Sequence, residues 1–400
     1  MRLNIKKIRD NAHKRNKEFY KYLTAMNISR FGAFLTYFSV ALIVYSIYRS
    51  GIMLSIFELV SVVPVILLSV PIGMWLTNRD LKKVWYLSSI IIGTFNIVVF
   101  MNLNIYFLFA LNLITTVFSI CIGISSQSIL PEIVGKEELP WANSVIMFSV
   151  SAMGMISPAV SGFILSYSWN LPFLIDSLTY FVEAVIVFML SVNITAKNIE
   201  KREKPRISFR EYFGYLRRNK LLRNILIIVT FLMFVAGGLK ILHIAYFSGY
   251  EKPYTYYGLA MSVSAVGFFL ILLFTTLKIL VIKKPYKVCI LSLPLYVMFF
   301  AAIYISNSAS FAIVCFLLLG LGNGLLSPNF TATIQKYTEK SYLTSILGIY
   351  QTLINGGRIA SISITGFLVT IFQPRILYLF IGIAFGIVFL IFLPSIRYER

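Results

Sequence analysis

Long apolar stretches recur along the whole of this 400-residue chain. Most are about 17 to 26 residues long, and a helix of about 20 apolar residues crosses the ~30 Å hydrocarbon core of a membrane. Only 13% of the residues are charged, against about 25% in an ordinary soluble domain. The sequence therefore predicts an all-α integral membrane protein with twelve transmembrane helices, at about 22–48, 51–76, 85–101, 105–130, 141–166, 171–194, 221–247, 255–282, 288–305, 310–334, 343–371 and 375–394.

The positive charges lie on one side of the predicted membrane. The net charge is +21, and 29 of the 36 lysines and arginines fall on the side of the two termini if the spans alternate. The opposite side holds only Arg49, Lys252 and Arg375. By the positive-inside rule, both termini and the linker 195–220 are cytoplasmic, as in a multi-pass protein of the cell membrane. The same charges can attract anionic inner-leaflet lipids. This interpretation covers nearly all the positive charge and argues against nucleic-acid binding.

Motifs of enzymes and ATP-driven pumps are missing from the sequence. Cys121, Cys289 and Cys315 lie inside predicted spans without metal-ligand spacing, and the two histidines are too far apart for a metal cluster. There is no phosphate-binding glycine loop, no GxSxG and no HExxH. We therefore expect no cofactor, no metal and no enzyme activity. If the protein transports a substrate uphill, we expect an ion gradient to drive that transport.

A basic linker divides the chain into two halves of six predicted spans. From Ser208 the linker places apolar and aromatic residues on one helical face and arginines opposite, which predicts an amphipathic helix on the membrane surface. We predict a cytoplasmic N-terminus at 1–21, six-helix bundles at 22–194 and 221–394, the linker at 195–220 and a cytoplasmic tail at 395–400.

The two halves repeat one another at an offset of 204 residues. "KVWYLS" at 83–88 matches "KVCILS" at 287–292, and "GFIL" at 162–165 matches "GFLV" at 366–369. Because each half crosses the membrane an even number of times, the repeat is parallel. Two such bundles can rock about a central site, which is the architecture of a transporter.

The segment "SVPIGMWLTNRDLKKVW", between spans two and three, resembles the Gly-x-Leu-Ala-Asp-Arg-x-Gly-Arg-Arg signature of the major facilitator superfamily. Arg79, Lys82 and Lys83 match its basic positions, while both of its glycines are replaced. In the family the aspartate takes part in a charge relay between helix ends. Asn78 stands in its place here, so the relay loses its negative charge.

Three further stretches carry the resemblance. "GMISPAVSGFIL" in span five resembles the Gly-Pro-x-x-Gly-Gly antiporter motif that marks exporters, with Pro158 and Gly162 matching and Ser157 and Ser161 replacing glycines. A packing kink without functional meaning is the alternative, since small residues let helices approach and proline frees a carbonyl. "FREYFGYLRRNKLLRN" resembles the helix between the bundles. "PFLIDSLTYF" resembles the start of span six in the branch with macrolide efflux proteins and the enterobactin exporter.

This resemblance covers the whole chain and implies two pseudo-symmetric six-helix bundles. It implies that spans one, four, seven and ten line a cavity, and that spans two, five, eight and eleven form the seam between halves. The implied function is proton-coupled export of an amphipathic small molecule, such as a macrolide-type drug, by a monomer working through alternating access. A siderophore or a lipid-like metabolite is the alternative substrate. A non-transporting membrane scaffold or sensor is the alternative class.

Charged side chains inside the spans are the candidate functional residues, since each costs at least ~2.5–3.5 kcal/mol at the centre of a transmembrane helix. Asp176 and Glu183 are nearly two turns apart, so both lie on one face of span six. Asp176 is near the outer end, where it can merely cap the helix. Glu183 is near mid-depth, where it can carry a proton or make a structural hydrogen bond. Arg30 lies in span one, towards the cytoplasm.

Span eleven carries a polar stripe at the expected seam, formed at helical spacing by Gln351, Asn355, Arg358 and Thr365. Glu58 in span two and Lys240 in span seven both lie in the outer third of their spans. We expect Glu58 to pair with Lys240 or Arg358. Such a pair is either static, avoiding an unpaired buried charge, or breaks as the cavity opens outward.

The predicted topology can be tested at the linker. A cysteine introduced by Ser208→Cys should resist membrane-impermeant thiol reagents in intact cells, because the positive-inside rule places 195–220 in the cytoplasm. Labelling should appear once the cells are permeabilised. Efficient labelling of intact cells would reverse the topology.

Overall fold

The computed structural model describes residues 2–76, 79–135, 138–191, 215, 217–277, 279–280 and 282–398. Over these ranges the chain is almost entirely helical and contains no β-strand. Twelve helical segments are long and apolar enough to cross a membrane, which confirms the predicted all-α fold and the number of spans. Asn78 and most of the predicted amphipathic linker helix lie outside the described residues.

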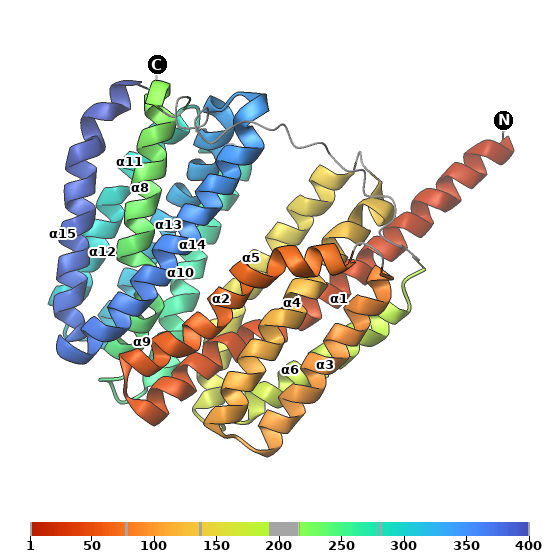
Figure 1. Cartoon of the computed structure of the whole chain (residues 1–400), viewed down its shortest axis with the longest axis horizontal. Coiled ribbons are helices and arrows are strands. Elements are labelled where there is room, and N and C mark those ends of the chain that lie inside the picture. Colours follow the sequence, from red (N-terminus) through yellow and green to blue (C-terminus); the bar gives the residue numbers. More distant parts are fainter. Residues whose placement is uncertain are drawn as a thin grey trace. The chain divides into compact units, whose positions relative to one another are not determined.

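The helices follow one another with short connections (Figure 1). They are α1 (Arg2–Tyr48), α2 (Gly51–Leu76), α3 (Leu81–Met101), α4 (Ile105–Val134), α5 (Leu139–Leu165), α6 (Leu171–Phe188), α8 (Lys220–Ala236), α9 (Leu239–Phe247), α10 (Pro253–Thr276), α11 (Pro285–Leu291), α12 (Leu293–Ile305), α13 (Ala309–Tyr337), α14 (Lys340–Ile371) and α15 (Pro374–Phe392), followed by the 3₁₀ helix η2 (Leu393–Tyr398). The seventh span consists of α8 and α9, and the ninth of α11 and α12.

Two helix boundaries differ from the predicted spans. Helix α1 extends back to Arg2, because residues 2–21 contain neither proline nor glycine to stop it. Helix α10 ends at Thr276, although the eighth span was predicted to continue to residue 282.

Polar side chains in the short connections start several of the helices. Asp80 caps α3 by accepting a hydrogen bond from the Lys83 backbone N–H at 3.1 Å. Asn104 does the same for α4, and Asn219 for α8. These caps satisfy backbone donors that have no partner within the helix. Local sequence therefore sets where these helices begin.

The chain forms two compact units, residues 1–43 with 60–201 and residues 44–59 with 202–400. The division crosses both α1 and α2. The end of α1 and the first turns of α2 therefore pack with the second unit, whereas the sequence placed all of 22–194 in the first bundle.

In the first unit, α3 packs against both α4 and α6 (Figure 1). Trp85 of α3 is fully buried, and the Tyr22 ring of α1 meets it edge-on with ring centroids 5.3 Å apart. The Tyr22 hydroxyl donates to the Ser126 carbonyl of α4 at 3.2 Å. These contacts hold α1 against α3 and α4, and α1 and α3 both reach the face of α6 that carries the acids.

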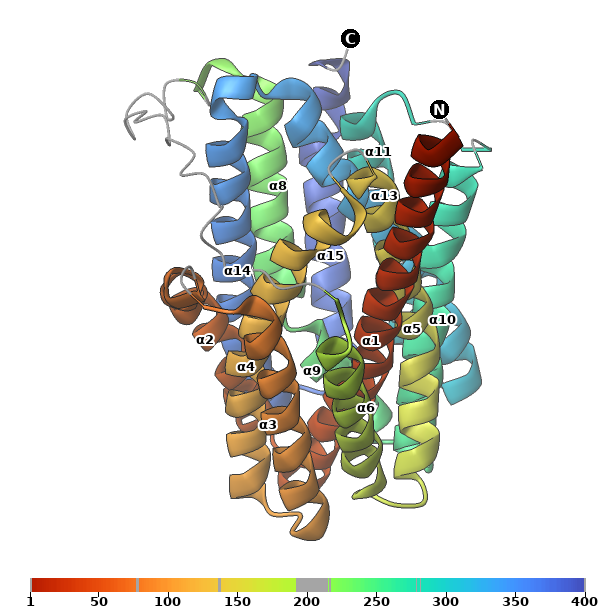
Figure 2. The ribbon, with the colours of Figure 1, turned by 90° about the vertical axis from the view of Figure 1, so that its right-hand side faces the viewer.

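In the second unit, α10 packs against α13 and α12 packs against α15. Helix α8 packs against α14 (Figure 2). The α10–α13 contact is very close: a Cβ atom added at Gly320 would lie 1.9 Å from the Ser264 carbonyl oxygen. A Cβ atom at Gly267 would lie 2.6 Å from the Leu317 carbonyl oxygen. Small residues at such crossings let backbones approach, which is a main source of helix association in membranes.

His243 of α9 lies in an aromatic cluster of the second unit. Its Nδ1 is 2.6 Å from the Tyr378 hydroxyl, and the rings of Phe299 and Phe316 meet the imidazole edge-on. The side chain is 3% exposed. A single hydrogen-bonded histidine among aromatic rings is a packing feature of this core.

The close α10–α13 contact gives a stability prediction. Gly320→Ala should lower the free energy of unfolding by about 1–3 kcal/mol, because the added methyl group has no room. Gly123→Ala in α4 is the matched control, since a Cβ there meets nothing within 4 Å and alanine favours the helix. Thermal unfolding of the purified variants in detergent measures both. Equal midpoints for the two variants would contradict the close contact.

Candidate functional site

Glu183 of α6 is buried against α3. Its Oε1 accepts a hydrogen bond from Trp85 Nε1–H at 3.0 Å, and its Oε2 accepts one from the Ser89 hydroxyl at 2.8 Å. The side chain is 1% exposed. No described residue forms an ion pair with it. Neutral donors from a neighbouring helix therefore hold this carboxyl deep in the first unit.

Arg30 of α1 is close enough to Glu183 for a coulombic interaction. Its Nη1 is buried without a hydrogen-bond partner in the described structure, as is Oδ1 of Asn27 one turn before it. Arg30 and Asn27 of α1 therefore each have a buried polar atom that can still form a hydrogen bond.

Asp176 lies on the same face of α6 as Glu183, as predicted, and is equally buried. The expectation that it caps the helix is wrong. Helix α6 begins at Leu171 with Asn170 at the N-cap position, so Asp176 lies in the second turn. Its carboxyl is packed against α1, where a Cβ added at Gly32 would come within 2.6 Å of Asp176 Oδ1. A residue this far into the helix cannot reach the free N–H groups of the first turn.

Glu58 of α2 and Lys240 of α9 form an ion pair within the second unit. Lys240 Nζ donates to Glu58 Oε1 at 2.7 Å, and the two side chains are 5% and 16% exposed, Glu58 being the more buried. Of the two partners expected for Glu58, the structure therefore shows Lys240. Among the described residues, Arg358 makes no ion pair.

The seventh span is interrupted between α8 and α9, at Gly237 and Gly238, two residues before Lys240. The Gly238 backbone N–H donates to the Ser361 hydroxyl of α14 at 2.9 Å, which replaces a bond lost at the interruption. A Cβ on Gly238 would lie 2.3 Å from Thr365 Oγ1, so only glycine fits. The sequence reading missed this feature; its signal was the paired glycine in "VAGGLK".

Helix α14 also contacts the first turns of α2. The Ser55 hydroxyl donates to the Ile362 carbonyl at 2.8 Å, and the backbones of Gly51 and Gly366 nearly touch. The ion pair at Glu58 lies one turn beyond Ser55. Close backbone packing and a charged pair therefore stabilise the same helix junction.

The predicted polar stripe of α14 divides along its length. Gln351 is exposed, Asn355 and Arg358 are half-buried, and Thr365 is buried. The Cα atom of Arg358 packs against Gly237, where a Cβ would lie 2.8 Å away. The stripe thus runs from the exposed Gln351 into the junction around the interrupted span.

The basic positions of the signature-like loop have separate partners. The Arg79 guanidinium lies over the Trp75 ring at 5.2 Å, and Lys83 Nζ is 3.9 Å from Asp80. Lys82 Nζ donates to the Leu190 carbonyl at 2.6 Å, just beyond the end of α6.

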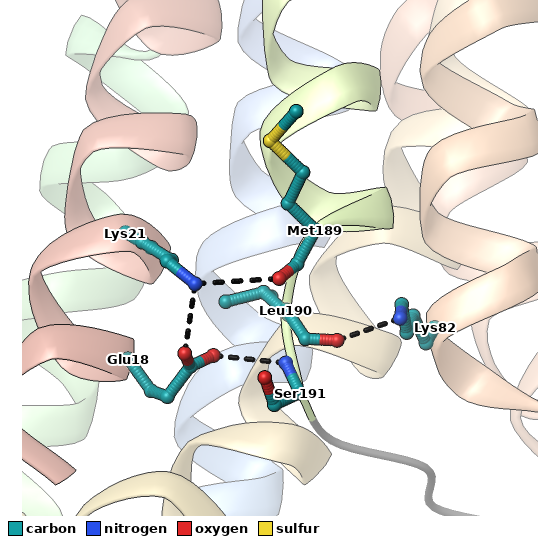
Figure 3. Close-up of polar contacts among 6 residues, drawn as sticks. All are labelled: Glu18, Lys21, Lys82, Met189, Leu190 and Ser191. Atoms are coloured by element: carbon teal, nitrogen blue, oxygen red, sulfur yellow. Dashed lines mark hydrogen bonds and ion pairs between the residues drawn. The ribbon is translucent and has the colours of Figure 1, made fainter. Parts of the chain in front are cut away.

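Helix α1 holds the same end of α6 (Figure 3). Lys21 Nζ donates to the Met189 carbonyl at 3.4 Å, and Glu18 accepts from the Ser191 backbone N–H at 2.9 Å. Glu18 and Lys21 also pair with each other at 2.8 Å. Lysines suit the negative end of a helix, so these contacts together with Lys82 fix where α6 ends and the linker begins.

The antiporter-like residues lie in α5, with Pro158 and Gly162 both buried. The serine that replaces a family glycine between them, Ser161, lies 2.8 Å from the Ser39 hydroxyl and donates to the Leu35 carbonyl at 3.3 Å. The substitution therefore adds polar contacts between α5 and α1 where glycine would offer none.

A family model described as Major Facilitator Superfamily matches residues 22–362 and 252–399. The chain belongs to the major facilitator superfamily. Membership makes the protein a multi-pass membrane transporter of a small molecule and not an enzyme. No curated protein sequence matches the chain significantly.

Solved structures of superfamily transporters share the fold. A variant of the nucleoside transporter NupG has 13% identity and a TM-score of 0.73, covering 95% of this chain and 99% of its own. A bacterial homolog of the human lysosomal transporter Spinster, inward-facing and unoccupied, has 13% identity and a TM-score of 0.70, with coverage of 96% and 98%. A variant of the peptide transporter POT has 14% identity and a TM-score of 0.73, with coverage of 96% for both chains.

The Glu58–Lys240 pair can be tested by a double-mutant cycle. Glu58→Gln and Lys240→Met should each lower the free energy of unfolding by roughly 3 kcal/mol, since each leaves a buried charge without its partner. The double variant should recover much of that loss. Arg358→Met, which removes a charge outside the pair, is the control and should not couple to Glu58→Gln. Additive losses in thermal unfolding would contradict the pairing.

Proposed function

We propose that this protein is a proton-coupled exporter of an amphipathic small molecule, such as a macrolide-type drug, working by alternating access. The observation that carries the proposal is the environment of Glu183. This carboxyl is buried in a transporter bundle and bonded only to neutral donors, so its charge can change without breaking an ion pair.

The hydrogen bonds of Ser89 accommodate both protonation states of Glu183. The Ser89 hydroxyl lies within bonding distance of two acceptors, Glu183 Oε2 at 2.8 Å and the Trp85 carbonyl at 3.1 Å. When Glu183 is ionised, the hydroxyl donates to Oε2. When Oε2 carries a proton, that proton is donated to Ser89 Oγ, and the Ser89 hydroxyl turns to the Trp85 carbonyl.

Arg30 supplies the second part of this arrangement. The ionised form of Glu183 gains from a positive charge on α1, and the neutral form does not. Loading and release of a proton therefore change the attraction between α1 and α6. In a transporter whose spans one and four line the cavity, such a change would link the proton to the position of α1.

Export, and not import, is proposed from the resemblance of Pro158 and Gly162 to the antiporter motif. The cytoplasmic placement of both termini and residence in the cell membrane are proposed from the charge distribution, and the monomeric state from the family. NupG and POT are nucleoside and peptide transporters, so the fold serves several classes of small molecule. A siderophore or a lipid-like metabolite is the second candidate substrate, from resemblance to the enterobactin exporter branch.

Transport in proteoliposomes with an imposed pH gradient tests the proposal against a panel of macrolides, catechol siderophores and lipids. Glu183→Gln should abolish uphill export, because glutamine cannot take up and release a proton. Exchange of substrate without a gradient should persist, because exchange needs rocking of the bundles but no net proton transfer.

Two serine variants sharpen this test. Ser89→Ala removes the hydroxyl that accommodates both states and should lower uphill export more than exchange. Ser88→Ala removes a neighbouring buried hydroxyl that is not bonded to Glu183 and should leave both activities unchanged. Full uphill export by Glu183→Gln would exclude Glu183 as the proton carrier.

A further inference from the structure

Asp176 is surrounded by neutral oxygen groups from three helices of the first unit. Thr179 Oγ1, on its own helix, lies 3.5 Å from Asp176 Oδ1, which is long for a hydroxyl–carboxylate hydrogen bond. The side chains of Thr36 from α1 and Asn96 from α3 also lie beside the carboxyl. A carboxylate, an amide and two hydroxyls thus converge at one buried point.

Only part of the hydrogen-bonding capacity of these groups is used in the described structure. The Thr179 hydroxyl donates to the Asp176 backbone carbonyl at 2.7 Å, and Asn96 Nδ2 donates to the Ile92 carbonyl at 3.1 Å. Thr36 Oγ1 and Asn96 Oδ1 are buried, and neither makes a hydrogen bond of ordinary geometry. Asp176 is 1% exposed and forms no ion pair with a described residue. Its nearest charged neighbour in coulombic terms is Glu183, which has the same sign. Burying an ionised carboxylate without a positive partner costs free energy, so a cation bound beside Asp176 would stabilise the ionised carboxylate.

We propose that Asp176 and the oxygens of Thr36, Asn96 and Thr179 form a binding site for a single sodium ion. Hard cations take oxygen ligands, and all the side chains at this point supply oxygen. One carboxylate neutralises one monovalent charge, whereas a divalent ion would leave a net charge in the membrane. No three His, Cys, Asp or Glu side chains converge anywhere in the described residues, which argues against a transition metal.

Glu183 does not share this site. It lies seven residues further along α6, roughly 10 Å away along the axis, and has its own donors in Trp85 and Ser89. The ion bound at Asp176 would tie α1, α3 and α6 together, since each helix contributes at least one ligand. The site rests on these contacts alone and requires neither a particular substrate nor a direction of transport.

Sodium binding to the purified full-length protein tests the site directly. The thermal unfolding midpoint should rise and saturate as sodium chloride replaces choline chloride at constant ionic strength, because an ion that binds only the folded state stabilises it. Radioactive sodium should bind at one ion per chain. Asp176→Asn should lose both responses. Thr36→Val should weaken the apparent sodium affinity roughly tenfold or more by removing one oxygen ligand.

Ser89→Ala is the matched control, because it removes a buried hydroxyl from the surroundings of Glu183 and should leave sodium binding intact. The proposal is overturned if sodium has no effect on the unmodified protein, or if Thr36→Val and Asp176→Asn both retain the full response. A midpoint that follows pH but not sodium, with the pH response lost in Asp176→Asn, would show that Asp176 takes a proton instead and would overturn the proposal. An equal response to potassium chloride would also overturn the sodium assignment. None of these readouts requires transport, so their failure is separate from failure of the export proposal.

Discussion

Hydrocarbon offers no hydrogen bonds, so each polar group inside this protein must find its partner within the chain. The backbone meets that demand by forming helices throughout the twelve spans. Where a span is interrupted, at Gly237 and Gly238, the Ser361 hydroxyl supplies the missing acceptor. The serines that bond Gly238 and Glu183 meet the same requirement.

The two units satisfy buried charge in different ways. Glu58 has a positive partner in Lys240, so both groups must stay charged for the contact to persist. Such a pair stabilises the contact between α2 and α9 as long as both side chains stay charged and in place. Glu183 has the neutral donors Trp85 and Ser89, and this environment tolerates a carboxyl group in either protonation state. Only the second arrangement suits a group that takes up and releases a proton.

The internal repeat explains the architecture but not the location of this chemistry. At the 204-residue offset, Glu183 corresponds to Ile387 and Ser89 to Leu293, so the second half lacks the acid and its donor. Asp176 corresponds to Phe380. The second unit instead has an aromatic core around His243 and the ion pair at Lys240. The two halves therefore share short apolar stretches at this offset but differ in these polar residues.

The sequence by itself determined the twelve spans, the shared face of Asp176 and Glu183, and a choice of two partners for Glu58, because hydropathy and helical spacing act over neighbouring residues. Only the tertiary structure decided that Lys240 is that partner and that Asp176 lies past the helix cap. It alone joined Trp85 and Ser89 to an acid more than ninety residues away along the chain. It also assigned residues 44–59 to the second unit. These outcomes depend on which helices cross and how closely their small residues let them approach, and no local pattern in the sequence encodes that.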